Sequence, residues 1–357
     1  MDIDDAWLRL CLVPGVSAGL QRHLLESFGS PEAIARASDS ALTGFMKPTA
    51  LEAYRRGPNP ALVDRTLAWL SEPGHSLVTM AEARYPQLLL QIHDPPPVLY
   101  AHGRVELLTQ PGFAIVGSRN ATPLGAEDAQ RLAHALSEAG LVIVSGLALG
   151  IDAAAHRGGL AGASSSIAVM GTGADIFYPR RNRMLAAELA ARGCLLSELP
   201  LGTPPDRLNF PRRNRLISGL VRGVLVVEAA LESGSLITAF EALRQNRDVF
   251  AVPGSIHATL SKGCHKLIKE GAKLVESADD ILSDFGMARA CADSGLRHFG
   301  DAQGDALLDA LAVRPLSVDE LAQRTGLEAA TLAARLTRLE IQGTVQSIPG
   351  ARFQRVK

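Results

Sequence analysis

The sequence has little cysteine, and none of it is closely spaced. No CxxC pair occurs, and the four cysteines are far apart in the chain, at Cys11, Cys194, Cys264 and Cys291. Paired cysteines mark many zinc sites, and disulfide frameworks are typical of short secreted chains. We therefore expect reduced thiols, no metal site and no disulfide.

Long apolar runs are also missing. No run approaches the roughly 20 residues that a membrane-spanning helix needs. The first residues, "MDIDDAWLRL", are acidic where a signal peptide would be basic. We expect a cytoplasmic protein with no membrane span.

The chain carries almost no net charge. The formal value is -1 at pH 7, so any affinity for nucleic acid must come from a local basic patch. One stretch concentrates positive charge: "NFPRRNRLISGL", residues 209–220, holds three arginines and two asparagines before an apolar run that predicts the start of a helix. This stretch is either a solvated surface segment or a site built for phosphate.

The spacing of apolar residues divides the chain into several parts. With 357 residues and 47% hydrophobic content, the chain can form a full-size core and small accessory modules. Residues 1–80 have helical spacing and predict a small helical module, followed by the proline-rich connector "HDPPPVLYAHG" within the main domain, 81–285. We expect a linker over 286–302 and, over 303–357, a helix–turn–helix pattern with two short strands that resembles a winged helix.

The main domain alternates short apolar runs with helix-length segments. The runs are "FAIVGS" (113–118), "LVIVSG" (141–146), "SIAVMG" (166–171), "CLLSEL" (194–199), "VLVVEA" (224–229), "DVFAVPG" (248–254) and "KLVES" (273–277). Strands that are apolar throughout and separated by helices are typical of a parallel sheet covered on both faces. The fold class we predict is α/β, with a doubly wound, mostly parallel sheet.

Functional residues in such a fold are expected after the carboxyl ends of the strands. Here those segments read "GSRNATPLG", "SGLALGID", "GTGADIFYPRRN", "SELPLGTPPDRLNFPRRNR" and "EAALESGSLITAFEAL". They share glycines, hydroxyls and arginines, and a helix N-terminus beyond each turn favours an anion. Ser235 and Thr238 lie three apart at the start of a helix, so both hydroxyls can face one phosphate. The common ligand should be polyanionic.

The usual nucleotide-binding motifs are absent. No GxGxxG follows the first strand and no GxxxxGK[ST] occurs, which disfavours a dinucleotide or an ATPase loop, and we expect no cofactor. Asp152 and His156 lie at i and i+4 on one helix face. They could act as an acid–base pair or bind a metal. We favour a buried hydrogen-bonded pair that fixes the loop, because no third ligand or nucleophile accompanies them.

Taken together, the motifs resemble the DNA-processing protein A family (DprA/Smf). "AIVGSRNATPLG", "VSGLALGIDAAAHRGGL", "GTGADIFYPRRNRML", "LSELPLGTPPDRLNFPRRNRLISGL", "VVEAALESGSLITAFEAL", "DVFAVPGSI" and "SKGCHKLIKEGAKLV" stand in that family's order over about residues 80–285. The resemblance implies a Rossmann-like core that binds single-stranded DNA and dimerises. It also implies delivery of the strand to RecA, with displacement of the single-strand-binding protein, in natural transformation and homologous recombination. No enzymatic activity is implied.

The resemblance also implies the residues that contact the strand. We expect phosphate contacts from Arg119, Arg180 and Arg207, where the family often has lysine at the last two positions, and a groove shaped by residues 213–215. Single-strand sites also use aromatic faces for stacking; Phe177, Tyr178 and Phe210 are either such faces or core. The expected strand-binding set is Ser118, Arg119, Gly146, Gly173, Arg180, Asn182, Arg207, Phe210, Arg213, Asn214, Arg215, Ser235 and Thr238.

Two further contacts follow from the resemblance. Dimerisation maps onto "GCHKLIKEGAKL", with His265, Ile268 and Leu274 as contact residues, although the two aliphatic residues could instead face the core. The segment "LVPGVSAGLQRHLLESFGS" resembles a helix-hairpin-helix whose turn offers backbone amides to duplex DNA. Its hairpin has Ser17 where a second glycine is usual.

Two rival interpretations remain. A nucleoside-monophosphate phosphoribohydrolase of the same Rossmann-like superfamily would place a catalytic glutamate near a phosphate-binding helix start. "SGSLITAFE" has Glu241 three residues after Thr238 but lacks the paired glycines of "PGGxGT". A winged-helix transcription factor would read DNA through the helix carrying Arg335 and Arg338, which has few other polar side chains for that task.

Overall fold

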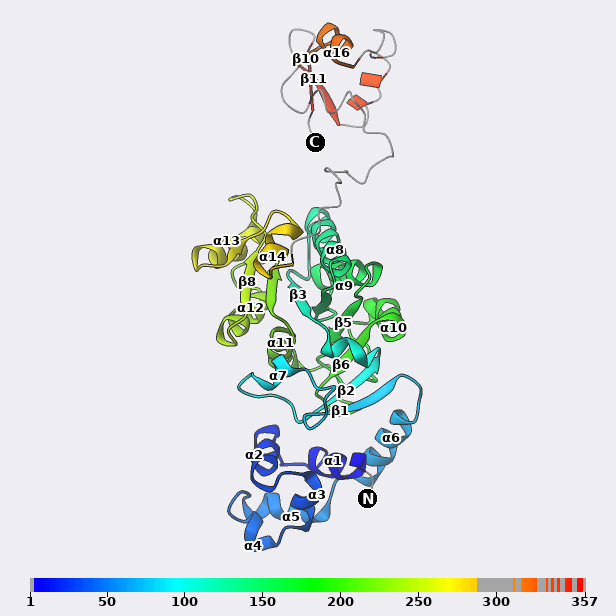
Figure 1. The fold of residues 1–357 in the computed structure, drawn as a ribbon, viewed down its shortest axis with the longest axis vertical. Helices are drawn as coiled ribbons and strands as arrows, with labels where there is room; N and C mark the ends of the chain where they lie inside the picture. Colours follow the sequence, from blue (N-terminus) through cyan, green and yellow to red (C-terminus); the bar gives the residue numbers. More distant parts are fainter. Residues whose placement is uncertain are drawn as a thin grey trace. The chain divides into compact units, whose positions relative to one another are not determined.

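The chain folds into two compact units, Met1–Arg289 and Ala290–Lys357 (Figure 1). The structure, a computed structural model, describes residues 3–287 and, beyond them, residues 311, 316–325, 332, 335–336, 339–340, 344–348 and 352–355. The linker predicted for 286–302 lies outside the described residues from position 288 onward, as does the predicted domain start at 303. Within the described residues, no helix is both long and apolar enough to cross a membrane.

The first unit begins with a helical module. Its helices are α1 (Ile3–Cys11), α2 (Ala18–Phe28), α3 (Pro31–Arg36), α4 (Asp39–Leu42), α5 (Pro48–Arg56) and α6 (Pro60–Leu70). Serines define several helix starts: the Ser17 hydroxyl accepts the amide hydrogen of Leu20, and Ser30 does the same for Ala33. The apolar faces of these helices pack around Leu24 and Ile34, which are fully buried.

The helical module is followed by a large sheet. Within residues 3–287 nine strands form it, in the order β1-β2-β6-β5-β4-β3-β7-β8-β9. Their bounds are β1 (His75–Thr79), β2 (Val98–Gly103), β3 (Gly112–Val116), β4 (Val142–Ser145), β5 (Ser166–Val169), β6 (Cys194–Ser197), β7 (Gly223–Val226), β8 (Asp248–Ala251) and β9 (Lys273–Leu274). Strands β3 to β9 pair in parallel, whereas β1 with β2 and β2 with β6 are antiparallel.

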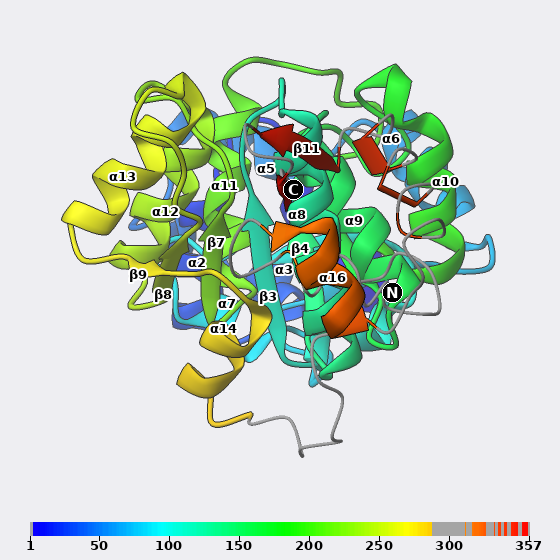
Figure 2. The same ribbon diagram turned by 90° about the horizontal axis from the view of Figure 1, so that it is seen from above.

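Helices cover both faces of this sheet (Figure 2). They are α7 (Gln87–Leu90), α8 (Pro123–Glu138), α9 (Ile151–Ala161), α10 (Arg183–Arg192), α11 (Asn209–Gly219), α12 (Gly234–Arg244), α13 (Lys262–Lys269) and α14 (Ala278–Asp284), with short 3-10 helices η1 (Val105–Thr109), η2 (Arg180–Asn182) and η3 (Thr259–Ser261). Alternate residues of β3 point to opposite faces. Phe113 and Ile115 pack toward α8, α9 and α14, and Ala114 and Val116 pack toward α11, α12 and α13.

The doubly wound, mostly parallel sheet predicted from the sequence is confirmed. All seven predicted apolar runs contain a strand. Two strands were not predicted, β1 and β2. Three of the five residues of β1 are polar, and β2 lies in the proline-rich stretch that was interpreted as a connector. Both lie at the antiparallel edge of the sheet, where the parallel-strand pattern does not apply.

The order of the strands creates a switch point beside β3. The chain runs from β3 through β4 and β5 to β6 on one side, and then from β7 through β8 to β9 on the other. The connections after β3 and β7 therefore leave toward opposite faces, which opens a crevice beyond their carboxyl ends.

The second unit contains a small three-stranded sheet. Its named elements are β10 (Leu316–Ser317), α16 (Val318–Thr325), β11 (Val345–Ile348) and β12 (Arg352–Arg355), with strand order β10-β12-β11. Leu316, Leu321 and Val345 are buried in its core. Of the two arginines through which the rival transcription-factor interpretation would read DNA, Arg335 is exposed and Arg338 lies outside the described residues.

Candidate functional site

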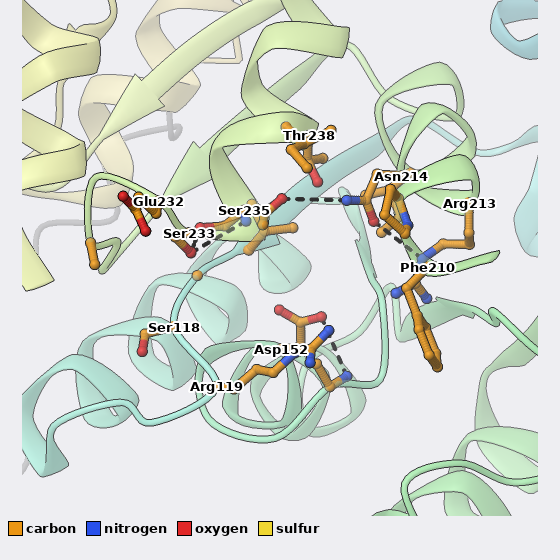
Figure 3. Close-up of a pocket in the computed structure, with 18 of the residues that line it drawn as sticks. Ser118, Arg119, Asp152, Phe210, Arg213, Asn214, Glu232, Ser233, Ser235 and Thr238 are labelled. Carbon is orange, nitrogen blue, oxygen red and sulfur yellow. Dashed lines mark hydrogen bonds between the residues drawn. The ribbon is translucent and has the colours of Figure 1, made fainter. Parts of the chain in front are cut away.

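A pocket of about 730 Å³ lies at the switch point of the sheet (Figure 3). The loop after β3, the start of α9, the segment around α11 and the start of α12 surround it. Its lining residues are Val116, Gly117, Ser118, Arg119, Asn120, Ala148, Asp152, Tyr178, Arg207, Phe210, Pro211, Arg213, Asn214, Ile217, Ala230, Glu232, Ser233, Gly234, Ser235, Ile237, Thr238 and Leu260. Eight of the thirteen residues predicted to contact the strand line this pocket.

One wall is the N-terminus of α12. Ser233 caps this helix, because its hydroxyl oxygen accepts the amide hydrogen of Ser235 at 3.3 Å, and the two hydroxyl oxygens are 2.7 Å apart. Thr238 follows one turn later on the same wall. The positive end of the helix dipole adds to these hydroxyl donors. This wall is suited to an anion, as the spacing of Ser235 and Thr238 predicts.

Two arginines supply the exposed positive charge of the pocket. Arg119 follows β3, and Arg207 precedes α11. Neither forms an ion pair with any residue that the structure describes, although the Arg119 guanidinium lies 6.0 Å from the centroid of the Phe210 ring. The loop that carries Arg119 is held by the Ser118 amide, which donates to the Glu228 carbonyl oxygen at 2.7 Å. The charges of both exposed arginines are therefore available to a ligand at the pocket.

An aromatic pair stands at one side of the pocket. The rings of Tyr178 and Phe210 have centroids 5.5 Å apart and planes inclined by 31°. Tyr178 is 45% exposed. Phe210 packs on Gly171, where a β-carbon would lie 2.6 Å from the ring, so only glycine leaves room for it. Phe177, by contrast, packs against the core, so of the three candidate aromatics only Tyr178 and Phe210 can offer a face to a base.

Arg213 joins α11 to the strand ends. Its buried guanidinium donates to the carbonyl oxygens of Gly146, at 2.8 Å, and of Val169. Burial lowers the pKa of Arg213 to about 10, and the negative charge of Asp152 acts in the opposite direction. Arg213 therefore fixes the position of α11, and its charge is largely enclosed by protein.

Asp152 and His156 both hold the loop after β4. The Asp152 carboxylate accepts the amide hydrogen of Gly146 at 3.1 Å, and the His156 Nε2 accepts that of Leu147 at 3.2 Å. Burial raises the pKa of Asp152 and lowers the pKa of His156 to about 3. The opposite ring nitrogen, Nδ1, lies 2.8 Å from the Ser166 hydroxyl. These contacts fit the favoured interpretation of a buried pair that fixes a loop.

Five predicted strand contacts do not line the pocket: Gly146, Gly173, Arg180, Asn182 and Arg215. Gly146 makes room for Arg213, since a β-carbon there would lie 2.5 Å from its guanidinium. Gly173 similarly makes room for the Pro200 carbonyl oxygen, because a β-carbon at position 173 would lie 2.7 Å from that oxygen. The tight packing at both glycines has a structural cause, and their backbone is not presented to the pocket.

The other three predicted strand contacts outside the pocket, Asn182, Arg215 and Arg180, differ in their surroundings. Asn182 is buried, and its amide donates to the carbonyl oxygen of Leu147 at 2.9 Å. Arg215 is largely buried and forms ion pairs with Glu198 and Asp94. Arg180 is exposed on η2 and forms no ion pair with the described residues. Arg180 is the only one of these three with its charge open to solvent.

The structure also corrects the expected start of α11. The arginine-rich stretch was interpreted as a loop before a helix, but α11 already begins at Asn209. Pro211 lies in the first turn of α11. Proline has no amide hydrogen, but amide hydrogens in the first turn of a helix have no acceptor within the helix, so no hydrogen bond is lost there. Asn214, one of the residues expected to shape the groove, donates from its amide to the Gly234 carbonyl oxygen at 3.4 Å and so joins α11 to α12.

Three polar lining residues were not predicted: Asn120, Glu232 and Ser233. A serine directly before the glycine that begins α12 is a common helix cap, so the sequence carried a signal for Ser233. Glu232 is exposed and forms no ion pair within the described part of the chain. No pattern in the sequence distinguishes it from an ordinary surface glutamate.

The predicted catalytic glutamate of the rival hydrolase does not belong to the pocket. Glu241 lies two turns into α12 and forms an ion pair with Arg244 at 2.9 Å. It is not among the lining residues. Among the described residues there is also no group of three or more histidine, cysteine, aspartate or glutamate side chains placed to hold a metal.

A second hollow lies at the far edge of the sheet. It measures about 870 Å³ and is lined by Leu231, Pro253, Ile256, Lys262, His265, Lys266, Ile268, Lys269, Glu270 and Leu274. His265, Ile268 and Leu274, the three residues predicted to form a dimer contact, thus lie together. Ile256 is 67% exposed and Leu274 47%. Exposed apolar side chains gathered in this way are typical of a protein contact surface.

The helix-hairpin-helix predicted near the N-terminus corresponds to α1, α2 and the turn between them. Pro14 and Gly15 are exposed in the turn, and Gly15 has a φ of 85°, which suits glycine. Duplex binding by this turn stays a prediction.

Comparisons with known proteins give a consistent result. Residues 76–286 match the family described as DNA recombination-mediator protein A, and residues 298–351 match the DprA winged helix domain. Protein Smf of Escherichia coli is 40% identical over 297 residues, which cover 81% of this chain and 79% of that protein. DNA processing protein DprA of Streptococcus pneumoniae is 49% identical over 201 residues, covering 56% of this chain and 71% of that protein.

Solved structures of two relatives are similar to this chain. The X-ray structure of DNA processing protein A from Streptococcus pneumoniae aligns with a TM-score of 0.70 at 37% identity, covering 80% of this chain and 99% of that one. The structure from Helicobacter pylori, solved to examine that protein's single-stranded DNA binding mode, aligns with a TM-score of 0.54 at 31% identity, covering 59% and 95%.

Proposed function

Because this chain belongs to the DNA recombination-mediator protein A (DprA/Smf) family, we propose that it binds single-stranded DNA in the pocket at the switch point. One observation carries the proposal. The same pocket is lined by the capped start of α12, by the Tyr178–Phe210 pair, and by Arg119 and Arg207, which form no ion pair with the described residues. A single strand needs positive charge for its phosphates and aromatic faces for its bases.

The charges of the pocket suit a strand better than a small phosphorylated metabolite. Arg119 and Arg207 come from separate segments of the chain, and Tyr178 and Phe210 line the same pocket. Phe210 lies on the same side of the pocket as Asn214 (Figure 3). Arg180 adds a further exposed charge outside the pocket. Phosphates of one strand can contact all three arginines in succession, whereas a mononucleotide inside the pocket leaves Arg180, which does not line it, without a ligand.

We propose that the bound strand is delivered to RecA in place of the single-strand-binding protein, during natural transformation or homologous recombination. The hollow around Ile268 and Leu274 would form the contact of a homodimer, which places two strand-binding pockets in one assembly. The protein acts without chemical conversion of the DNA in this proposal. The position of Glu241 outside the pocket supports that view against the hydrolase alternative.

The decisive experiment compares single-stranded and double-stranded oligonucleotides by fluorescence anisotropy over a salt series. We expect salt-sensitive preference for the single strand. Release of ribose 5-phosphate from AMP is assayed in parallel. Tight preference for the duplex, or release of base from AMP, would contradict the proposal.

Delivery to RecA needs its own measurement. RecA assembly on a strand coated with single-strand-binding protein is followed with and without this protein. Faster assembly in its presence supports delivery. If the rate of RecA assembly is unchanged although this protein binds the strand, the proposal of strand binding stands and the proposal of delivery to RecA is contradicted.

A further inference from the structure

A chain of alternating charges connects the helical module to α11. Arg22, on α2, forms an ion pair with Asp94 and donates to the Pro95 carbonyl oxygen at 3.0 Å. The other carboxylate oxygen of Asp94 lies 3.6 Å from the Arg215 Nη2, on α11. A single connector residue, Asp94, thus contacts one arginine from the module and one from the helix that lines the pocket.

The chain of charges continues into the core at Glu198. This carboxylate follows β6 and contacts Arg215 with one oxygen, while the other lies 3.6 Å from the Arg212 Nε. The Glu198 side chain is 5% exposed and that of Arg215 is 12%. Two guanidinium nitrogens of Arg215 are buried with no hydrogen-bond partner among the described residues. A buried charge of this kind depends on the carboxylates that remain beside it.

A second contact joins the module to the same edge of the sheet. Arg65, on α6, forms an ion pair with Asp175, which follows β5. The other oxygen of Asp175 accepts the amide hydrogen of Gly202, after β6, at 2.8 Å. The apolar core of the module also includes Ala174 and Leu201 from these two loops. The module therefore packs on the loops that lead to Tyr178 and Arg207.

We propose that the N-terminal helical module braces the strand-binding pocket, with Arg22 and Arg65 as positioning residues. The inference rests on the proposed function. Arg22 holds the connector so that Asp94 stays beside Arg215 and keeps α11 in place. Arg65 holds the loops after β5 and β6 through Asp175. Neither arginine lines the pocket, and each acts on the strand through other residues.

The test measures single-strand affinity over a salt series for the full chain, the variants Arg22→Ala and Arg65→Ala, and a control. The control is Arg55→Ala, because Arg55 is also a module arginine with an ion pair, but to Asp39 within the module, at 2.7 Å. We expect roughly three- to tenfold weaker binding in the first two variants, as for other residues coupled to a site without touching its ligand. The control should bind like the original chain.

The salt slope separates positioning from direct contact. Loss of an arginine that touches phosphate reduces the slope of log Kd against log salt by about one. We expect an unchanged slope in Arg22→Ala and Arg65→Ala. We also expect Asp94→Ala to weaken binding at least as much as Arg22→Ala, because it removes the contacts of Asp94 with both Arg22 and Arg215. The double variant should bind no more weakly than Asp94→Ala alone.

The outcomes distinguish this inference from the proposed function. If the original chain shows no preference for single strands, the proposed function fails and the brace fails with it. If the original chain binds as expected but both variants retain its affinity, only the brace is overturned. A slope reduced by one in either variant also overturns it, in favour of direct phosphate contact. The Arg65 side chain is 52% exposed, so we expect Arg65→Ala to fold. Arg65→Ala therefore tests the brace even if Arg22→Ala unfolds.

Discussion

The Arg213 guanidinium donates to the carbonyl oxygen of Gly146 at 2.8 Å and occupies the space in which a side chain at position 146 would lie. The two residues are 67 positions apart in the chain. Their contact ties α11, which carries Phe210 and Asn214, to the end of β4. The pocket therefore depends on a glycine that does not itself line it.

Replacing that glycine should disturb both stability and binding. In Gly146→Ala the added β-carbon would lie 2.5 Å from Arg213 Nη2, and overpacking of this kind costs about 1–3 kcal/mol. We expect a lower free energy of unfolding in urea and weaker single-strand binding. Gly44→Ala is the matched control, because the nearest atom there is 3.9 Å away. Equal stability of the two variants would contradict the packing argument.

Arg119 should contribute through its charge. Because it lines the pocket without an ion-pair partner among the described residues, Arg119→Ala should weaken single-strand binding about tenfold and reduce the salt slope by about one. Arg131→Ala is the control, since Arg131 is exposed on α8 and pairs with Asp128 at 2.7 Å. An unchanged slope in Arg119→Ala would show that this arginine does not contact phosphate.

Tyr178 should contribute through its ring. Stacking of a base on an aromatic side chain is worth about 1–3 kcal/mol, so Tyr178→Ala should weaken binding by about five- to a hundredfold. The salt slope should not change, because no charge is removed. Tyr178→Phe keeps the ring and should bind normally. A loss of affinity in Tyr178→Phe equal to that in Tyr178→Ala would assign the effect to the hydroxyl.

His156 should make stability depend on pH. Burial lowers its pKa to about 3 from a usual value of 6.5, so between these values the unfolded chain binds a proton that the folded protein does not. The free energy of unfolding should therefore fall as the pH decreases below 6.5, by about 1.4 kcal/mol per unit from this group. The Asp152 pKa is raised, which acts in the opposite direction at lower pH.

Urea unfolding between pH 7 and pH 5 measures this dependence. His156→Gln should be less stable at pH 7 but should show a flatter pH profile. The exposed His23 on α2 is the control, and His23→Gln should keep the original profile. If His156→Gln retains the full pH dependence, another group is responsible.

The hollow around Leu274 should set the oligomeric state. We expect the original chain to elute as a dimer in size-exclusion chromatography with light scattering. Placing a carboxylate on this apolar surface disfavours a close contact, so Leu274→Asp should elute as a monomer. Leu243→Asp tests the specificity, because Leu243 is similarly exposed, at 48%, but lies outside the hollow. A monomeric original chain, or dissociation in both variants, would contradict a dimer through this surface.

Local patterns were sufficient to predict most of the sheet. The apolar runs that became β3 to β7, and β8 after its first residue, are buried, so their composition alone marks them as strands, whereas the two residues of β9 are exposed. The edge strand β1 lacks that composition, and β2, although largely apolar and buried, follows directly on three prolines in a stretch interpreted as a connector. The segments after β3 and β7 could be predicted as site residues because the carboxyl ends of parallel strands meet at one edge.

What the sequence by itself determined was the class of fold, the strand-end segments and the kind of ligand they suit, since these depend on composition and on short-range spacing. Only the tertiary structure decided which arginines are open to a ligand. Arg207, Arg213 and Arg215 look alike in the sequence, yet the first is exposed at the pocket, the second is enclosed against Gly146, and the third is paired with Glu198. The partners of the last two, Gly146 and Glu198, follow other strands of the sheet. Burial, which is a property of the packed fold, decides whether a charge faces DNA or protein.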